Sequence, residues 1–189
     1  MTLEVADTDL PGVRLLRPRR HEDARGSFSE TWSRAAWAAA GIAVEFVQDN
    51  QSLSRSPGTV RGLHFQRPPM AQAKLVRVLQ GAILDVVVDI RPDSPTFRRH
   101  VAIELDAAGG GQLFVPAEGF AHGFCTLAPD TVVFYKVSAP YAPQHERGIL
   151  WCDPALAIPW PVAPAAAILS DRDRTQPTLG ALLGGAPCG

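Results

Sequence analysis

The stretch from Arg61 to Lys74 gathers the side chains of this chain that are best suited to chemistry. It reads Arg61-Gly-Leu-His-Phe-Gln-Arg-Pro-Pro-Met-Ala-Gln-Ala-Lys74 and lies between two strongly β-patterned runs. An imidazole with a reference pKa of about 6.5 can take up and release a proton near neutral pH. Cations beside it can stabilise an enolate or bind a phosphate. We therefore expect His64 to be a general base, although a core histidine and surface cations are the simpler alternatives.

A second histidine occurs in the segment Pro116-Ala-Glu-Gly-Phe-Ala-His122, which follows Gly110. This segment resembles the second conserved motif of the cupin superfamily, whose members are double-sheet jelly rolls with an interior active site. The first cupin motif usually supplies two histidines and an acid as metal ligands, but the matching place here reads His64-Phe-Gln66. A first-row metal needs three or more protein donors. We expect no metal, and a metal-dependent oxygenase with His64 and His122 as ligands is an alternative.

Two further candidates occur later in the chain. Tyr135 lies in the strand-like run 132–136 and, with a reference pKa of about 10, stays protonated at neutral pH. It can act as an acid where His64 acts as a base, although the pattern alone favours a core aromatic. Leu169-Ser-Asp-Arg-Asp173 is a compact polar segment after an apolar, proline-rich run. An acid in it could contact His64 and favour its protonated form, but sequence spacing cannot show that contact.

The elements that must position these residues are short strands. The 17 prolines and 16 glycines are spread through the chain and separate short apolar runs, as is typical of antiparallel sandwiches and barrels. The run 84–91 is apolar at nearly every position and predicts a central strand covered on both faces. The predicted strands are 13–18, 44–47, 60–66, 75–79, 83–90, 100–105, 112–115, 123–127 and 132–137.

Little helix is expected between these strands. Residues 33–40 are alanine-rich and bounded by Ser33 and Gly41, so they form the best predicted helix. Residues 21–26 predict a turn-rich loop, the chain after Ile149 is irregular, and a short helix begins near Thr178. The predicted fold is all-β, a cupin-type double-sheet jelly roll with a few short peripheral helices.

The composition excludes several classes of protein. Lys plus Arg number 18 against 19 Asp plus Glu, so the net charge provides no strong attraction to nucleic acid or to a membrane. The N-terminal residues resemble neither a signal nor a transit peptide, and the apolar run 155–169 is broken by prolines. We expect a cytoplasmic, soluble single domain. Cys125, Cys152 and Cys188 are odd in number and widely spaced, so they indicate neither a disulfide framework nor a CxxC zinc or redox site, and packing explains Cys125 better than catalysis.

An ordered set of blocks resembles the dTDP-4-dehydrorhamnose 3,5-epimerase family. The blocks are 23–30, 48–50, 61–66, 72–76, 85–91, 94–97, 119–124, 135–136, 151–154 and 170–173. The resemblance implies a cupin-type homodimer that acts, without metal or organic cofactor, on a dTDP-linked 4-keto-6-deoxyhexose. It also implies that 1–45 form an arm at the dimer interface, 46–150 the jelly-roll core and 151–189 a C-terminal cap.

The resemblance further implies a role for individual residues. His64 would remove the proton beside the ketone with Asp173 as its carboxylate partner, Lys74 would lie by the keto oxygen, and Tyr135 would return a proton on the opposite face. Arg25, Phe28 and Glu30 match positions that reach the nucleotide, often across the dimer. The remaining substrate-contacting positions are Gln48, Asn50, Arg61, His122, Tyr141, Glu146 and Arg172, the last of which is often lysine in the family.

Three other functions fit the same residues. A relative that inverts only carbon 3, or a ketoisomerase of the same architecture, would use the same base, cation and acid. The other two belong to different classes: the metal-dependent oxygenase, and a non-catalytic sugar-nucleotide binder whose binding would survive removal of His64.

Overall fold

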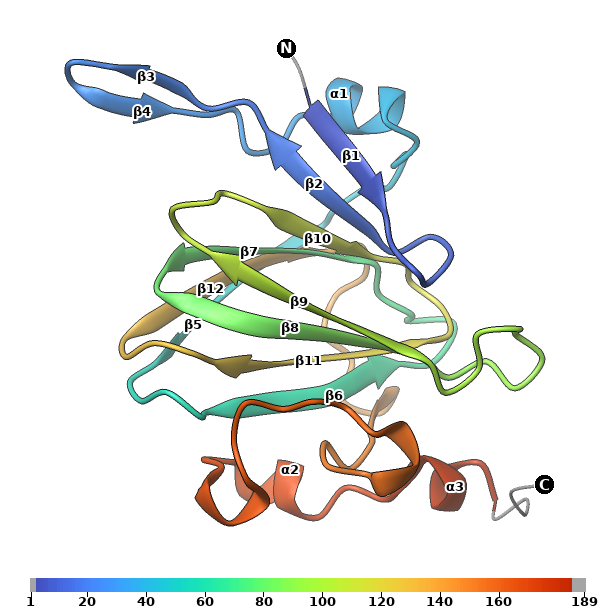
Figure 1. Ribbon diagram of the computed structural model, residues 1–189. Helices are drawn as coiled ribbons and strands as arrows, with labels where there is room; N and C mark the ends of the chain where they lie inside the picture. Colours follow the sequence, from blue (N-terminus) through green and yellow to red (C-terminus); the bar gives the residue numbers. More distant parts are fainter. Residues whose placement is uncertain (1–2, 185–189) are drawn as a thin grey trace.

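Two antiparallel sheets face each other in the computed structural model of the chain, which describes residues 3–184 (Figure 1). The six-stranded sheet has the order β1 (Leu3–Asp7), β2 (Arg14–Pro18), β10 (Gln112–Val115), β7 (Lys74–Gln80), β12 (Thr131–Val137) and β5 (Gln48–Ser54). The five-stranded sheet has the order β13 (Glu146–Gly148), β6 (Val60–Gln66), β11 (Phe120–Thr126), β8 (Ala82–Asp89) and β9 (His100–Asp106). The predicted all-β jelly roll is confirmed.

The core fills the space between the sheets and continues beneath the five-stranded one. Strand β8 shows why, because its side chains alternate between the two faces. Ile83 and Val87 pack into the cluster between the sheets, whereas Val86 and Val88 pack with Ile149 in the cluster on the other face. The predicted central strand covered on both faces is therefore confirmed. Burial of the free thiol of Cys125, which raises its pKa to about 11, likewise confirms the packing interpretation.

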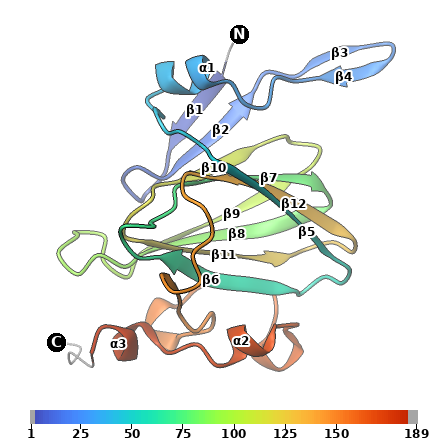
Figure 2. The same cartoon turned by 180° about the vertical axis from the view of Figure 1, so that it is seen from behind.

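Residues 21–28 form a hairpin that projects away from the two sheets (Figure 1). Its strands are β3 (His21–Asp23) and β4 (Gly26–Phe28), and all six of their residues are exposed. The predicted loop at 21–26 was wrong because the carboxylate of Asp23 accepts the backbone N–H of Arg25 at 2.8 Å, which closes a tight turn between two strands. The predicted helix is confirmed as α1 (Arg34–Ala39), which lies on the far side of the six-stranded sheet from β6 (Figure 2).

The boundaries of several strands differ from the predictions. The predicted strand 44–47 is wrong, since the strand β5 starts only at Gln48 and continues through a polar sequence. Pairing with β12, from Gln48 opposite Val137 to Ser54 opposite Thr131, overrides the weak β-propensity of that sequence. Strand β11 begins at Phe120, three residues before the predicted start at Gly123. The edge strands β1 and β13 were not predicted.

The C-terminal segment runs beneath the five-stranded sheet, next to β6 (Figures 1 and 2). It contains η1 (Pro154–Leu156), η2 (Pro164–Ala166), α2 (Asp171–Arg174) and α3 (Leu179–Leu182). Its irregular path and the short helix near Thr178 are as predicted, whereas α2 was not expected to be helical. The buried carboxylate of Asp153 accepts backbone N–H groups from Ala155 at 3.0 Å and from Leu179 at 2.7 Å. Asp153 thereby joins the beginning of this segment to its end.

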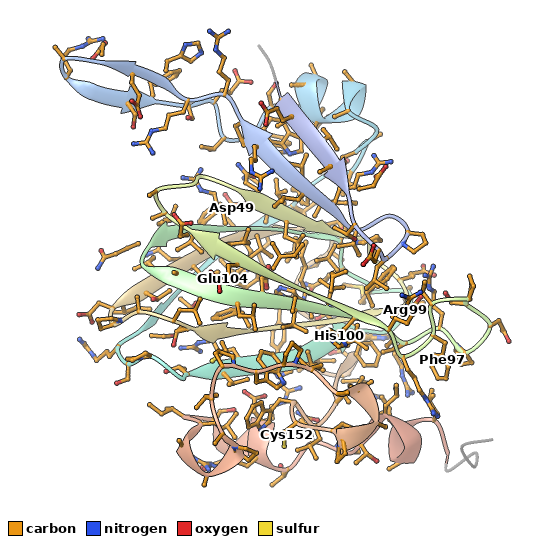
Figure 3. All side chains as sticks on the ribbon, in the orientation of Figure 1. Asp49, Phe97, Arg99, His100, Glu104 and Cys152 are labelled. Carbon is orange, nitrogen blue, oxygen red and sulfur yellow. The ribbon has the colours of Figure 1, made fainter. Side chains whose placement is uncertain are left out.

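Two remaining sequence expectations concern the cysteines and the membrane. Cys152 lies in the C-terminal segment below the sheet (Figure 3), and its thiol is free. Cys188 lies outside the described residues. Within 3–184, none of the helices has the length and apolar character needed to cross a membrane.

Candidate active site

A cavity of about 520 Å³ lies between the inner faces of the two sheets and α2. It brings together seven residues that the sequence singled out, and they come from β6, β7, β11, β12 and the C-terminal segment: Arg61, His64, Lys74, His122, Tyr135, Arg172 and Asp173. A larger cavity of about 700 Å³ lies among proline-rich loops near Phe65 and Pro92 and contains none of the predicted site residues. The chemistry of the chain is therefore concentrated in the smaller cavity.

His64 and Asp173 form a close pair at the floor of this cavity. The Nε2 atom of His64 lies 2.6 Å from Oδ1 of Asp173. Ser170 is the N-cap residue of α2, and its hydroxyl accepts the backbone N–H of Asp173 at 3.1 Å, which fixes the backbone that carries the carboxylate. Burial acts to raise the pKa of Asp173, but the hydrogen bonds from His64 and Ser170 hold that pKa below its usual range. Because Asp173 engages Nε2, Nδ1 is the His64 atom available to take a proton from a substrate.

Lys74 points into the cavity from β7. Its ammonium lies 3.4 Å from the backbone carbonyl oxygen of His64. Burial lowers the pKa of Lys74 to about 8, while the carboxylates of Asp85 and Glu146 act in the opposite direction. Lys74 is therefore a cation at neutral pH, close to the base.

Tyr135 faces His64 from the opposite sheet. It lies on β12 of the six-stranded sheet, whereas His64 lies on β6 of the five-stranded sheet, and both line the same cavity. Burial raises the pKa of Tyr135 above its usual value, with smaller and opposing effects from Arg61 and Glu146. The phenol is therefore protonated at neutral pH. A base and an acid on two opposite walls can act on the two faces of one ring.

Arg61 lies at the cavity wall beside β5. Its Nε donates to the hydroxyl of Ser54 at 3.2 Å, and its Nη2 donates to the carbonyl of Leu53 at 3.3 Å. These bonds hold the guanidinium in place without a carboxylate partner from the described part of the chain, so its charge is available to an anionic ligand.

The other predicted substrate-contacting residues form a network at the rim. One oxygen of Glu146 accepts the hydroxyl of Tyr141 at 2.5 Å and a guanidinium N–H of Arg172 at 2.6 Å. Gln48 donates to the side-chain oxygen of Asn50 at 2.8 Å and accepts the backbone N–H of Tyr141 at 3.1 Å. Of these residues only Arg172 lines the cavity itself. The rest connect β5, the loop after β12, and β13 around its edge.

His122 lies beside His64 on the neighbouring strand. The two residues are directly opposite in the β11–β6 pairing, which shifts register between His122 and Phe124. A Cβ atom on Gly62 would lie only 2.5 Å from the Cα of Gly123, so both positions need glycine for the strands to approach here. Nε2 of His122 lies 2.6 Å from Oδ1 of the buried Asp85. Burial lowers the pKa of His122 although Asp85 favours its charged form.

The sequence reasoning assigned no role to Asp85. Its signal was an acid in the middle of the apolar run 84–91, where a charge must be buried if the strand is central.

Arg25, Phe28 and Glu30 do not line this cavity. Phe28 is 71% exposed, and Arg25 forms an ion pair with its neighbour Asp23 on the projecting hairpin. Figure 1 shows this hairpin at the end of the molecule opposite to the C-terminal segment that carries Asp173. A role of these three residues in nucleotide binding stays a prediction.

The donor atoms of the cavity suit proton transfer. Within residues 3–184, no group of three or more His, Cys, Asp and Glu side chains is arranged to hold a metal ion. Each of the two imidazoles in the cavity directs one ring nitrogen to a carboxylate, His64 to Asp173 and His122 to Asp85.

Comparisons with known proteins agree on one family. The family model of dTDP-4-dehydrorhamnose 3,5-epimerase matches residues 7–181. A protein of that name from Sinorhizobium fredii is 54% identical over 168 residues, which cover 88% of this chain and 85% of the relative.

Solved structures give the same result. The dTDP-4-dehydrorhamnose 3,5-epimerase of Bacillus anthracis, with TDP and PPi bound, is 50% identical with a TM-score of 0.90, over 94% of this chain and 99% of that one. A 3'-monoepimerase from Streptomyces bikiniensis, in complex with dTDP-quinovose, is 34% identical with a TM-score of 0.86, over 95% and 91% of the two chains.

Proposed function

Because the chain belongs to the dTDP-4-dehydrorhamnose 3,5-epimerase family and is an isomerase of that type, we propose that it inverts carbons 3 and 5 of dTDP-4-dehydro-6-deoxy-D-glucose. The product is dTDP-4-dehydro-L-rhamnose. One observation carries this proposal, namely that the His64–Asp173 pair and Tyr135 lie on opposite walls of one cavity. Such an arrangement suits removal of a proton from one face of a sugar ring and return of a proton to the other.

The proposed reaction begins at the carbon next to the ketone. Nδ1 of His64 takes the proton from that carbon, and the electron pair of the C–H bond moves into an enolate whose charge lies on the keto oxygen. Lys74 stabilises this oxygen, because a cation placed at developing charge lowers the barrier. Asp173 stabilises the imidazolium that His64 becomes.

Tyr135 completes the inversion from the other wall. Its phenol gives a proton to the carbon on the opposite face, the enolate returns to the ketone, and the configuration is inverted. His64 then loses its proton to water and Tyr135 regains one, so the enzyme is restored for the second carbon. No redox step is involved.

The nucleotide-binding residues form a second part of the proposal. Arg25, Phe28 and Glu30 bind the thymidine diphosphate of a substrate held in the cavity of a second copy of this chain. Two observations support this: the hairpin is exposed, with Phe28 71% exposed, and it lies away from the cavity of its own chain. At substrate concentrations well below KM, the Arg25→Ala variant binds substrate poorly and the His64→Ala variant has no base, whereas a mixed dimer of the two would have one intact site. Failure of the mixture to regain activity, with dimers present, would contradict the shared site.

The test of the epimerase activity uses heavy water. The chain is incubated with the 4-keto-6-deoxy sugar nucleotide in deuterium oxide, and deuterium is counted separately at carbons 3 and 5. We expect incorporation at both carbons. A folded protein that introduces no deuterium is not an epimerase of this type.

Inversion at carbon 3 alone is the second candidate function. The similarity to the 3'-monoepimerase from Streptomyces bikiniensis, which is 34% identical to this chain, favours this candidate. The 3,5-epimerase from Sinorhizobium fredii is more similar, at 54% identity, so inversion of both carbons comes first. The same deuterium count separates the two, because a monoepimerase labels carbon 3 only.

A further inference from the structure

Two aspartates on β8 point to the inside of the jelly roll, and they differ in how they are bonded. Asp85 and Asp89 are four residues apart on the strand and both are fully buried. Both carboxylate oxygens of Asp89 have hydrogen-bond partners, since they accept hydrogen bonds from Arg91, Ser94 and Thr96. Among the described residues Asp85 has one partner only, because Oδ1 meets His122 and Oδ2 has no hydrogen-bond partner there.

A buried carboxylate with an unpaired oxygen is costly and therefore needs an explanation. Hydrophobic residues surround Asp85 on its own strand, where Ile83 and Val87 belong to the core between the sheets. An apolar side chain would pack there at no such cost. The presence of a carboxylate at this position suggests that its charge acts on residues of the neighbouring cavity.

The first neighbour of Asp85 is His122. An ionised carboxylate can only accept a hydrogen bond, so the Nε2 atom of His122, 2.6 Å away, must carry a proton. Burial keeps the imidazole of His122 neutral by lowering its pKa, against the effect of Asp85. A neutral ring with a proton on Nε2 has a lone pair on Nδ1. His122 lines the cavity and therefore offers it a hydrogen-bond acceptor.

The second neighbour is Lys74. The charge of Asp85 is the larger of the two carboxylate effects that oppose the loss of the proton from Lys74, and Glu146 supplies the other. Lys74 lines the same cavity as His122, the residue to which Asp85 is bonded. The other titratable or charged side chains of that lining are Arg61, His64, Tyr135, Arg172 and Asp173. Removing Asp85 would therefore leave Lys74 with the weaker of its two supporting carboxylates.

We infer that Asp85 is a positioning residue for the reaction, which acts through two residues of the cavity. It fixes His122 in the tautomer that accepts a hydrogen bond from a hydroxyl group of the sugar, and it keeps Lys74 charged for the enolate. This inference rests on the proposed function for the identity of the sugar. Its NMR tests do not, because they measure ring protonation and lysine titration directly.

The first test is nitrogen NMR of the histidine rings in the unaltered protein at neutral pH. The chain has five histidines, so the signals of His122 are assigned as those lost in His122→Gln. We expect Nε2 to be protonated and Nδ1 to be unprotonated. A proton on Nδ1, or on both nitrogens, overturns the inference. This measurement needs no variant of Asp85 and remains decisive if such a variant does not fold.

The second test compares Asp85→Asn with Asp89→Asn. The Asp85→Asn variant should lower the titration midpoint of Lys74, followed by NMR, by about one unit, because one nearby negative charge is lost. In an activity assay this loss corresponds to about a fivefold decrease at pH 8, beyond any decrease seen at pH 6, since only the charged lysine acts. The Asp89→Asn variant removes an equally buried charge from the same strand and face, so it should lower the melting temperature without moving that midpoint.

The comparison of the two variants decides the inference. A lysine midpoint that is unchanged in Asp85→Asn, or that moves equally in Asp89→Asn, overturns it. If the protein shows no epimerase activity but the ring tautomer and the lysine midpoint are as expected, the proposed function fails while the positioning role of Asp85 stands.

Discussion

The cavity and the projecting hairpin differ in how firmly the rest of the chain holds their residues. The cavity residues are held by partners from several strands, such as Asp173 for His64 and Ser54 for Arg61, before any substrate arrives. The hairpin residues Arg25 and Phe28 are exposed and contact almost nothing beyond their own turn. Proton transfer demands groups fixed in advance, whereas binding of a nucleotide can be completed by a second molecule. The difference suggests that one chain supplies the chemistry and another supplies part of the affinity.

Replacing the base should have the largest effect. His64→Ala removes the group that takes the proton, so we expect kcat to fall by about 10²–10⁴-fold, the range typical of general-base catalysis. Deuterium incorporation beside the ketone should disappear with it. His100→Ala serves as the control, because this residue lies on the edge strand β9, does not line the cavity and should leave kcat unchanged. Retention of deuterium exchange by His64→Ala would show that another residue is the base.

Replacing the acid should separate exchange from inversion. Tyr135→Phe keeps the ring but removes the proton donor, so we expect the rate of product formation to fall by about 10²-fold. The His64–Asp173 pair is intact in this variant, so exchange of the carbon-bound proton with heavy water should persist. Equal losses of exchange and inversion would contradict the placement of acid and base on opposite walls.

Changing the hairpin should affect binding and not chemistry. Phe28→Ala removes an exposed ring that we propose binds the nucleotide of the second copy, so KM should rise by about tenfold with kcat nearly unchanged. Val5→Ala alters another exposed apolar side chain and provides the control. If Phe28→Ala lowers kcat and leaves KM as it was, the proposed division between hairpin and cavity is wrong.

The smallest expected effect is on the pH dependence. Lys74 has a pKa of about 8 in the free protein, and only its protonated form stabilises the enolate. Activity supported by Lys74 is therefore fully present well below pH 8 and falls as the pH rises through that value, to about half at pH 8 itself. A profile of kcat/KM against pH measures this. Lys74→Arg, which stays charged, should extend the plateau to higher pH even if its overall activity is lower.

The strands in the interior of the molecule were predicted more accurately from the sequence than the strands at the sheet edges. The alternation and apolar runs of β6, β8 and β12 placed His64 and Tyr135 on strands because buried strands have strong patterns. The strand β5 was missed since its polar residues gain their strand conformation from pairing with β12, which is not visible locally.

The partners within the site were harder to predict. His64 and Asp173 are 109 residues apart, and the path of the C-terminal segment decides whether they meet. The family resemblance implied that contact, and the residues alone did not. For Asp85 a local signal existed, because an acid in a buried strand requires a partner. That partner, His122, lies on the neighbouring strand.

Asp153 has a consequence for the catalytic pair. Its carboxylate binds the N–H of Leu179, 26 residues later, so the segment that carries Asp173 is tied at both of its ends. A closed loop samples far fewer positions than a free tail, and the entropic cost of closing this loop is part of the free energy of folding. The effective concentration of the Asp173 carboxylate at His64 is thus raised by a residue that touches neither of them.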